Sequence, residues 1–303
     1  MPITPSAAAS GQFRIGGDIT VNRLGFGAMR LTGKGIWGEP EDRAEAIRVL
    51  KRLPELGVNF IDTADSYGPD VSEELIAEAL YPYPDDLVIA TKGGLVRPGP
   101  NRWAPDGHPK HLRQACEGSL RRLRLEQIPL YQLHRPDPAV PLAESVGTIA
   151  ELKNEGKIRH VGISNVTEEE LREAQRIVPI VSVQNRHNVS DRRSQSMIDL
   201  CEQEQLVFLP WAPVQEADRH PAVAAAAERH NVTQHQVVLA WLLACSPQIL
   251  PIPGTGSPQH AEENIAAAGL QLSADEVAAI SRQPLMQKTV AAARTVARRA
   301  LRR

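Results

Sequence analysis

Three apolar runs of the sequence lead into residues whose side chains can hold or transfer a proton. Asp62 and Tyr67 follow the first run, Lys92 ends the second and His134 ends the third. A tyrosine loses its proton at about pH 10, but a nearby ammonium group lowers that pKa, and a carboxylate keeps the ammonium charged. With Lys92 and Asp62 as such partners, Tyr67 is predicted to donate a proton to a carbonyl oxygen. Neutral His134 would orient and polarise the same oxygen.

This proton chemistry needs a bound hydride donor, because none of the four side chains can deliver a hydride to a carbonyl carbon. Each residue alone also has a structural explanation, such as a helix cap for Asp62 or the exposed end of a strand for Lys92. Tyr67 could be a packed surface aromatic, and His134 a hydrogen-bonded structural histidine. All four explanations would have to hold at successive strand ends, so we favour a shared site.

The elements that must position these residues are eight short apolar runs alternating with longer helical patterns such as 41–57 and 145–157. Continuous apolar runs are typical of parallel strands that are covered on both faces. The runs are VNRLGFG (21–27), VNFID (58–62), LVIATK (87–92), PLYQLH (129–134), HVGIS (160–164), IVSVQN (180–185), LVFLPW (206–211) and ILPIPG (249–254). Eight strands joined by helices over about 250 residues favour an α/β fold of the (β/α)8 TIM-barrel type, whose strand ends converge on one mouth. A doubly wound sheet is the alternative, because periodicity does not show closure.

Two further segments flank the predicted barrel, which extends over about 21–284. QFRIGGDITV (12–21) predicts an N-terminal β-hairpin that could cover one mouth of the barrel. The tail at 285–303 predicts a C-terminal basic helical extension, solvated or docked on the barrel, with its arginines four residues apart. No Gly/Ser linker or repeat divides the chain, so we expect residues 1–303 to form a single domain.

Composition excludes several classes of protein. The 303 residues are 42% hydrophobic and carry a formal net charge of -2, which argues against a dedicated nucleic-acid binder. Cys116, Cys201 and Cys245 are scattered, which predicts no disulfide framework, and no His, Asp or Glu grouping has metal-ligand spacing. The N-terminus lacks a secretory pattern, and no apolar stretch is long enough for an integral membrane segment. We expect a cytoplasmic protein.

The chain resembles the aldo-keto reductases through several linked motifs in family order, from LGFGAM (24–29) to Asn264. The carrying segments are FIDTADSYG (60–68), VIATKGG (88–94), LYQLHRPDP (130–138), VGISN (161–165), VSVQN (181–185) and IPGTGSPQHAEEN (252–264). The resemblance implies a barrel with an N-terminal hairpin across its base. It also implies NADPH-dependent reduction of an aldehyde or ketone to an alcohol, reversible as alcohol oxidation.

The resemblance also implies a role for each matching residue. Tyr67 would be the general acid/base, Lys92 and Asp62 the partners that lower its pKa, and His134 the donor that orients the substrate. Trp211 would stack on the nicotinamide, whose amide would be held by Ser164, Asn165 and Gln184. The full cofactor-binding set is Gly27, Ala28, Met29, Asp62, Ser164, Asn165, Gln184, Trp211, Pro213, Gly254, Thr255, Gly256, His260, Glu263 and Asn264.

The expected cofactor is NADP, with NAD as the alternative. Gly254 and His260 stand where many family members have a lysine and an arginine for the 2′-phosphate, so weaker discrimination against NAD is expected. Thr255 and Ser257, at the start of the following helix, could accept a phosphate, and His260 would help only while protonated. The loop 212–220 carries two acids near the expected phosphate position.

The expected substrate is a small carbonyl compound. Several segments look like a bacterial subgroup that includes pyridoxal reductases, so pyridoxal or another small aromatic or aliphatic aldehyde is the candidate. In the long loop 94–107, Arg97, Arg102 and Trp103 could meet an anionic or aromatic substrate, or the loop could simply be exposed around a packed tryptophan. A cofactor-binding regulatory or interaction subunit with little turnover is the alternative function. The sequence leaves the oligomeric state open.

Overall fold

Seven parallel strands form the central sheet of the computed structural model, which describes residues 5–282. Their order across the sheet is β11-β10-β9-β8-β5-β4-β3. The strands are β3 (Phe26–Gly27), β4 (Phe60–Asp62), β5 (Val88–Gly93), β8 (Ile128–Leu133), β9 (Ile158–Ser164), β10 (Ile180–Gln184) and β11 (Val207–Phe208). Each corresponds to one of the first seven predicted runs, so the parallel α/β arrangement is confirmed.

The eighth predicted run closes the sheet into a barrel. On one side its Leu250 N–H donates to the Phe208 carbonyl at 2.9 Å, next to β11. On the other side the Gly25 and Gly27 N–H groups donate to the Pro251 and Pro253 carbonyls, at 3.0 and 3.2 Å. The two prolines have no N–H, so bonds to β3 run in one direction only and the run does not form a regular strand. The fold is therefore a (β/α)8 barrel rather than an open doubly wound sheet.

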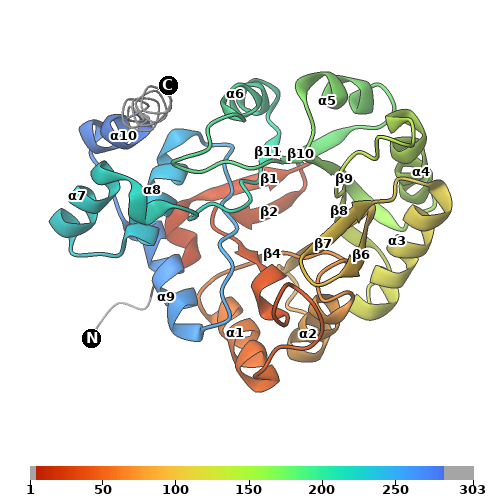
Figure 1. The fold of residues 1–303 in the computed structure, drawn as a ribbon, viewed down its shortest axis with the longest axis horizontal. Helices are drawn as coiled ribbons and strands as arrows, with labels where there is room; N and C mark the ends of the chain where they lie inside the picture. Colours follow the sequence, from red (N-terminus) through yellow and green to blue (C-terminus); the bar gives the residue numbers. More distant parts are fainter. Residues whose placement is uncertain (1–4, 283–303) are drawn as a thin grey trace, which may run out of the picture.

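Helices surround the strands and cover the outside of the barrel (Figure 1). They are α1 (Arg43–Glu55), α2 (Val71–Leu80), α3 (Pro109–Leu123), α4 (Leu142–Asn154), α5 (Glu168–Gln175), α6 (Gln195–Glu204), α7 (Pro221–His230), α8 (Gln234–Cys245), α9 (Pro258–Ala266) and α10 (Ala274–Ser281). Side-chain caps fix where several of them begin: Asp42 accepts from the Glu45 N–H before α1, and Thr233 forms a capping box before α8. The predicted basic helix at 285–303 lies outside the described residues.

The predicted N-terminal hairpin consists of β1 (Gln12–Ile15) and β2 (Ile19–Asn22), paired antiparallel. Its Ile15, Ile19 and Val21 belong to one apolar cluster with barrel-lining residues such as Phe60 at the start of β4. The Asn59 side chain, just before β4, accepts from the Asn22 N–H at 2.8 Å. The hairpin therefore covers the end of the barrel where the strands begin.

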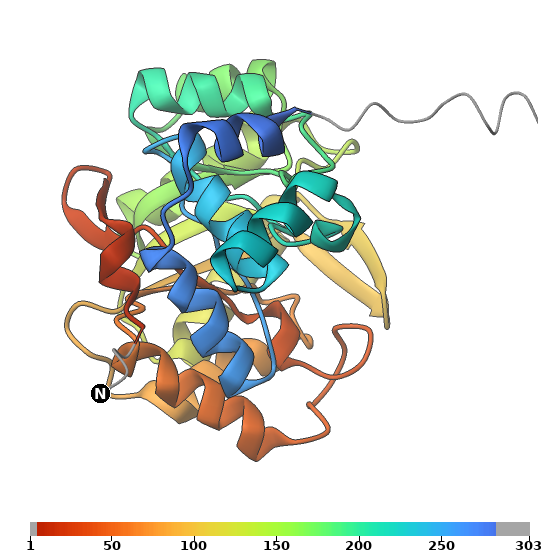
Figure 2. The same ribbon diagram turned by 90° about the vertical axis from the view of Figure 1, so that its left-hand side faces the viewer.

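A second hairpin replaces the loop predicted at 94–107. It consists of β6 (Leu95–Gly99) and β7 (Arg102–Pro105), with Asn101 in the left-handed region at its turn. Figure 2 shows the two hairpins at opposite ends of the molecule. Pro98, Gly99 and Pro100 are typical of turns, so the sequence did not indicate the two short strands. The expectation of an irregular loop is corrected.

No helix among residues 5–282 is long and apolar enough to cross a membrane.

Candidate active site

Four side chains from the ends of three strands meet at the carboxyl end of the barrel: Asp62 from β4, Tyr67 from the loop that follows it, Lys92 from β5 and His134 after β8. The Lys92 ammonium lies 2.6 Å from the Asp62 carboxylate and 3.4 Å from the Tyr67 hydroxyl. The Tyr67 and His134 rings meet edge to face, with centroids 5.8 Å apart. β4 and β5 are hydrogen-bonded neighbours and β5 pairs with β8, so strand register alone brings these residues to one opening.

Asp62 is the centre of a buried network. One of its oxygens accepts from the side chains of Gln132 and Gln184 at 3.1 and 2.9 Å, and the other accepts from Lys92. Lys92 also donates to the Thr63 carbonyl at 2.8 Å and has no exposed surface. Burial by itself lowers the pKa of Lys92, but the Asp62 carboxylate and the Tyr67 hydroxyl together outweigh it, and the pKa is raised. Lys92 is therefore an ammonium group at neutral pH.

The pKa of Tyr67 is not lowered, although the nearby Lys92 ammonium led us to expect a lowered value. Burial is the largest influence and raises the pKa of its phenol, Lys92 acts in the opposite direction, and the Asp62 charge raises the pKa further. The expected net lowering is corrected: Tyr67 is only 6% exposed, so desolvation outweighs one ammonium that is already paired. Tyr67 therefore keeps its proton at neutral pH, which is the protonation state that its predicted role requires.

His134 is held neutral. Burial lowers the pKa of its imidazole well below the ordinary value, and the charges of Lys92, Arg135 and Arg97 add to the effect. Its Nδ1 lies 3.3 Å from the Ser66 hydroxyl, and its backbone carbonyl accepts from the Asn165 side chain at 3.0 Å.

Two members of this network were not predicted from the sequence. Gln132 is fully buried within the apolar run before His134 and binds Asp62. A polar residue two positions before a strand-end histidine points to the same face of the strand, and that signal could have identified it. Ser66 stands inside the quoted motif but gave no separate sign that it would meet His134.

A second polar group lies beside the first, on β9, β10 and the segment after β11. Ser164 donates to the Gln184 carbonyl at 2.8 Å and accepts from Asn165 at 3.0 Å. The Trp211 indole N–H donates to the Asn165 side-chain oxygen at 3.1 Å. Asn165 has φ of 60°, a left-handed conformation that asparagine tolerates better than most residues. Amide donors and acceptors thus lie next to a partly exposed indole ring, an arrangement that fits a flat amide-bearing ring such as nicotinamide.

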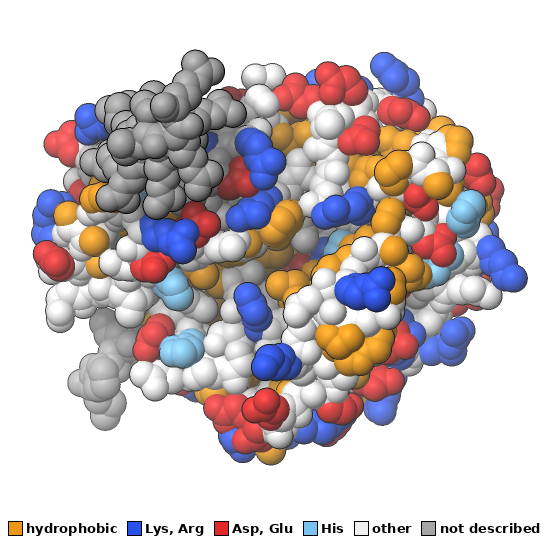
Figure 3. Space-filling model, in the orientation of Figure 1, with side chains coloured by type: hydrophobic (Ala, Val, Ile, Leu, Met, Phe, Trp, Pro, Cys, Tyr) orange, Lys and Arg blue, Asp and Glu red, His pale blue; other side chains and the backbone are white. Residues whose placement is uncertain are grey.

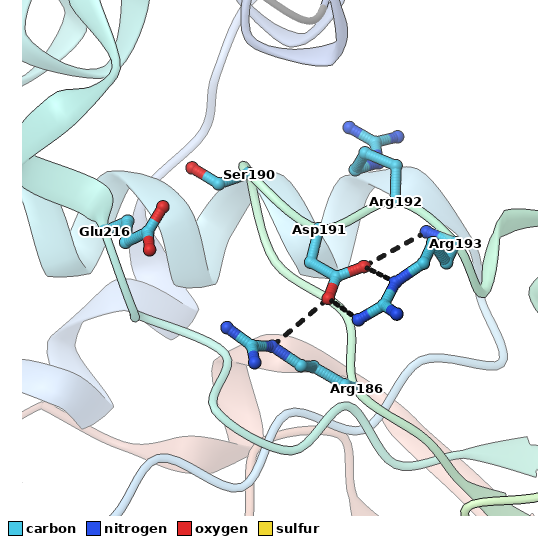
Figure 4. Close-up of a pocket in the computed structure, with 6 residues that line it drawn as sticks. All are labelled: Arg186, Ser190, Asp191, Arg192, Arg193 and Glu216. Atoms are coloured by element: carbon cyan, nitrogen blue, oxygen red, sulfur yellow. Dashed lines mark hydrogen bonds and ion pairs between the residues drawn. The ribbon is translucent and has the colours of Figure 1, made fainter.

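A cavity of about 490 Å³ lies between the loops that follow β10 and β11 (Figure 4). Asp191 stands between Arg186 and Arg193 and forms ion pairs with both, while Glu216 faces the cavity from the other loop. The Arg186 guanidinium lies over the Trp211 ring at 5.5 Å. Figure 3 shows the same face of the molecule hollowed above the β6–β7 hairpin, with basic side chains around the hollow.

The residues predicted to meet the far part of the cofactor lie at the start of α9. A Cβ on Gly254 would come within 2.4 Å of the Gly27 carbonyl, so this position admits no side chain unless the backbone moves. The Ser257 N–H donates to Thr255 Oγ1 at 3.1 Å, and Gly256 and His260 are exposed. Glu263 lines a cavity of about 430 Å³ with residues of the α7–α8 turn. The remaining predicted residues are Ala28 and Met29, which follow β3 in the short 3₁₀ helix Ala28–Leu31, Pro213 in the loop after Trp211, and Asn264, buried on α9.

The 254–264 segment makes no side-chain hydrogen bond to Asp62, Tyr67, Lys92 or His134 within the described part of the chain. It is linked to them through the backbone contact of Gly254 with Gly27, which pairs with Asp62 in the sheet. Over residues 5–282, no three His, Cys, Asp or Glu side chains gather as metal ligands.

Comparison with known proteins identifies close relatives. Residues 23–283 match the model of the aldo/keto reductase family. An uncharacterised oxidoreductase of Schizosaccharomyces pombe is 50% identical over 280 residues, which cover 91% of each chain. Pyridoxine 4-dehydrogenase of Escherichia coli is 41% identical over 266 residues, covering 85% of this chain and 93% of that enzyme. The crystal structure of an aldo/keto reductase from Klebsiella pneumoniae in complex with NADP and acetate matches with a TM-score of 0.77 at 26% identity, over 92% of this chain and 97% of that one.

Proposed function

The chain belongs to the aldo/keto reductase family, and on that premise we propose that it reduces an aldehyde or ketone to an alcohol with NADPH as the preferred cofactor. Family membership makes it a nicotinamide-dependent oxidoreductase. The observation that carries the proposal for the reaction is the buried contact from Asp62 through Lys92 to Tyr67, with neutral His134 beside the phenol.

Tyr67 is proposed as the general acid. When bound, the dinucleotide supplies the hydride to the carbonyl carbon, and the oxygen then needs a proton. Tyr67 retains a proton at neutral pH and can donate it to this oxygen. The phenolate left behind faces the Lys92 ammonium at 3.4 Å, and Asp62 keeps that ammonium charged. Alcohol oxidation uses the same groups in reverse, with the phenolate as the base.

His134 is proposed to position the substrate. A neutral imidazole donates a hydrogen bond to the carbonyl oxygen without competing with Tyr67 as an acid. Ser66 contacts Nδ1 of the ring, which leaves Nε2 for the substrate oxygen.

The nicotinamide is proposed to bind against Trp211. Asn165 is already hydrogen-bonded to the indole, and Ser164 and Gln184 join it in one polar group beside Asp62. This group offers donors and acceptors to a carboxamide, while the ring face of Trp211 would cover one face of the nicotinamide and leave the opposite face to pass the hydride to the substrate.

NADP is favoured over NAD although Gly254 and His260 carry no permanent charge. Arg30 is exposed and forms no ion pair within residues 5–282, and its Cγ would lie 3.5 Å from a Cβ on Gly254. A cation therefore stands beside the start of α9, where a phosphate would meet helix N–H groups. The NADP bound to the Klebsiella pneumoniae relative supports the same choice.

The proposed substrate is a small aromatic aldehyde, with pyridoxal as the first candidate. The support is the name of the Escherichia coli relative, pyridoxine 4-dehydrogenase, at 41% identity.

That the whole chain, residues 1–303, forms a single domain stays a prediction.

The test follows NADPH oxidation against a panel of aldehydes that includes pyridoxal. Lys92→Met should lower kcat by about 10²-fold or more, because the phenolate loses its ammonium partner. The exposed Lys51→Met serves as the matched control and should behave as wild type. Turnover in Lys92→Met equal to wild type would contradict the assigned chemistry. Binding of NADPH without turnover of any carbonyl compound would instead favour a regulatory subunit.

A further inference from the structure

Arg97, on the β6–β7 hairpin, is a buried cation with an unusual set of partners. All five of its N–H groups donate to backbone carbonyls, which is the full capacity of a guanidinium. The acceptors are Gly35 at 2.9 Å, Ile36 at 2.6 Å, Ser66 at 2.9 Å, Gly99 at 3.5 Å and Arg102 at 2.9 Å. Arg97 therefore joins the loop after β3, the residue before Tyr67 and both strands of its own hairpin.

Arg97 is not available to bind a substrate anion. It is 9% exposed, and within the described residues it has no carboxylate partner. A buried cation is costly unless its donors are satisfied, so the five carbonyl contacts hold the guanidinium in one orientation.

The flat face of this guanidinium holds Trp103. The Arg97 guanidinium carbon lies 3.6 Å from the centroid of the Trp103 ring, with Trp37 further away at 5.8 Å. Cation–π contact of this kind restrains the indole as well as attracting it. The Trp103 ring is thereby fixed relative to the loop that carries Tyr67.

Trp103 in turn meets the two residues proposed to hold the carbonyl oxygen. Its ring centroid lies 6.2 Å from that of Tyr67 and 6.3 Å from that of His134, both edge to face. Trp103 is only partly buried, so part of its ring remains open. Any group attached to a carbonyl carbon between Tyr67 and His134 must lie close to this indole.

We propose that Trp103 is the specificity-determining residue of the site and that the preferred substrate carries its aldehyde directly on a planar aromatic ring. This proposal rests on the reductase function proposed above. A flat ring can stack on, or meet edge to face, an indole that is already fixed, whereas a saturated ring of the same size is thicker and lacks the quadrupole. Arg97 is a positioning residue that acts through Trp103.

The experiment compares benzaldehyde with cyclohexanecarbaldehyde, which share a carbon count but differ in planarity. The kcat/KM ratio of the two substrates should favour benzaldehyde in the wild type. Trp103→Leu should lower that ratio about fivefold, and Trp103→Phe should keep most of it. Tyr81→Leu is the matched control, because Tyr81 is an exposed aromatic that directly follows α2.

Arg97→Lys tests the positioning role. A lysine has three donors on a point charge and cannot serve five carbonyls, so Trp103 should lose its fixed orientation and the ratio should fall as in Trp103→Leu. Calorimetric binding of benzamide and cyclohexanecarboxamide, which are not reduced, to the NADP-loaded wild type and Trp103→Leu gives a readout without turnover, and the same preference should appear.

Equal kcat/KM for the two aldehydes in the wild type, or an unchanged ratio in Trp103→Leu, would overturn the assignment of Trp103 and leave the reductase function intact. If no aldehyde is turned over, the proposed function fails, and the benzamide comparison still decides whether Trp103 selects flat ligands.

Discussion

The two ends of the barrel interior have opposite chemistry. Where the strands begin, the hairpin places Ile15, Ile19 and Val21 against an apolar interior. Where the strands end, a carboxylate and an ammonium are buried together, 2% and 0% exposed. One end of the barrel interior is thus apolar and stabilising, and the other gathers the buried charges of the proposed site, at the end of the strands where barrel sites usually lie.

The difference shows which end carries an energetic cost. Burying apolar side chains in the hairpin is favourable, whereas each buried charge at the other end must be offset by a partner. Some polar groups there have no partner in the described structure: one oxygen of Asp65 and both ring nitrogens of His187. Burial raises the pKa of Asp65 well above its ordinary value, and the Glu73 charge adds to this effect.

The largest expected effect comes from a substitution that removes a reacting group at the carboxyl end of the barrel and leaves the hairpin end unchanged. Tyr67→Phe removes one hydroxyl, and we expect kcat to fall about 10³-fold because the proton donor is lost. The melting temperature should change little, since the ring still packs against Trp103 and His134. Steady-state kinetics measure the loss of kcat, thermal unfolding measures the melting temperature, and fluorescence titration with NADPH checks that the cofactor still binds. Tyr81→Phe, on an exposed tyrosine, is the control; equal losses in both variants would refute the assigned acid.

The next largest effect comes from substitutions that weaken apolar packing at the hairpin end and leave the carboxyl end unchanged. Ile15 has no exposed surface, so Ile15→Ala should reduce the free energy of unfolding by about 3 kcal/mol and Ile15→Val by about 1 kcal/mol. Urea unfolding gives both values, and kcat/KM should stay at the wild-type level below the transition. The exposed Ile177→Ala is the matched control and should lose little. A large loss of kcat in Ile15→Ala would mean that the two ends are coupled.

The stability of the folded protein should depend on pH through a buried group at the carboxyl end of the barrel. Burial lowers the pKa of His187, which follows β10, from 6.5 to about 4. The unfolded chain therefore binds a proton at higher pH than the folded protein, and stability falls as pH drops from 6.5 towards 4. The contribution is about 2 kcal/mol between pH 6.5 and pH 5.

Urea unfolding at several pH values checks this, with His187→Phe expected to flatten the profile. His235→Phe, which replaces an exposed histidine, should keep the wild-type profile. An unchanged slope in His187→Phe would show that His187 is not the responsible group.

The smallest effect concerns the tip of the hairpin. Asp18 forms an ion pair with Arg159 at 2.7 Å and a hydrogen bond with His160 Nε2 at 2.6 Å, all partly exposed to solvent. Asp18→Asn should cost only about 0.5 kcal/mol, because solvent screens such pairs, and the loss should shrink further in high salt. Thermal unfolding at low and high ionic strength measures it. A loss as large as that of Ile15→Ala would show that the hairpin is held by charge rather than by apolar burial.

Much of the fold could be predicted from the sequence because the signals are local. Continuous apolar runs identified the strands, and Gly16 and Gly17 marked the first hairpin. The same runs located Asp62, Lys92 and His134 at strand ends, which is enough to place them at one mouth once the strands are parallel. The second hairpin was missed because Pro98 and Pro100 are typical of loops, and its antiparallel pairing depends on contacts rather than on composition.

The sequence by itself determined the alternation of strands and helices and the residue types at the strand ends, since both follow from periodicity along the chain. Only the tertiary structure decided that the last run closes the barrel, that Gln132 binds Asp62 and that Arg97 holds Trp103. It also decided the direction of the Tyr67 pKa shift. Burial and hydrogen bonding depend on what surrounds an atom in space, and most neighbours of these residues are distant in sequence.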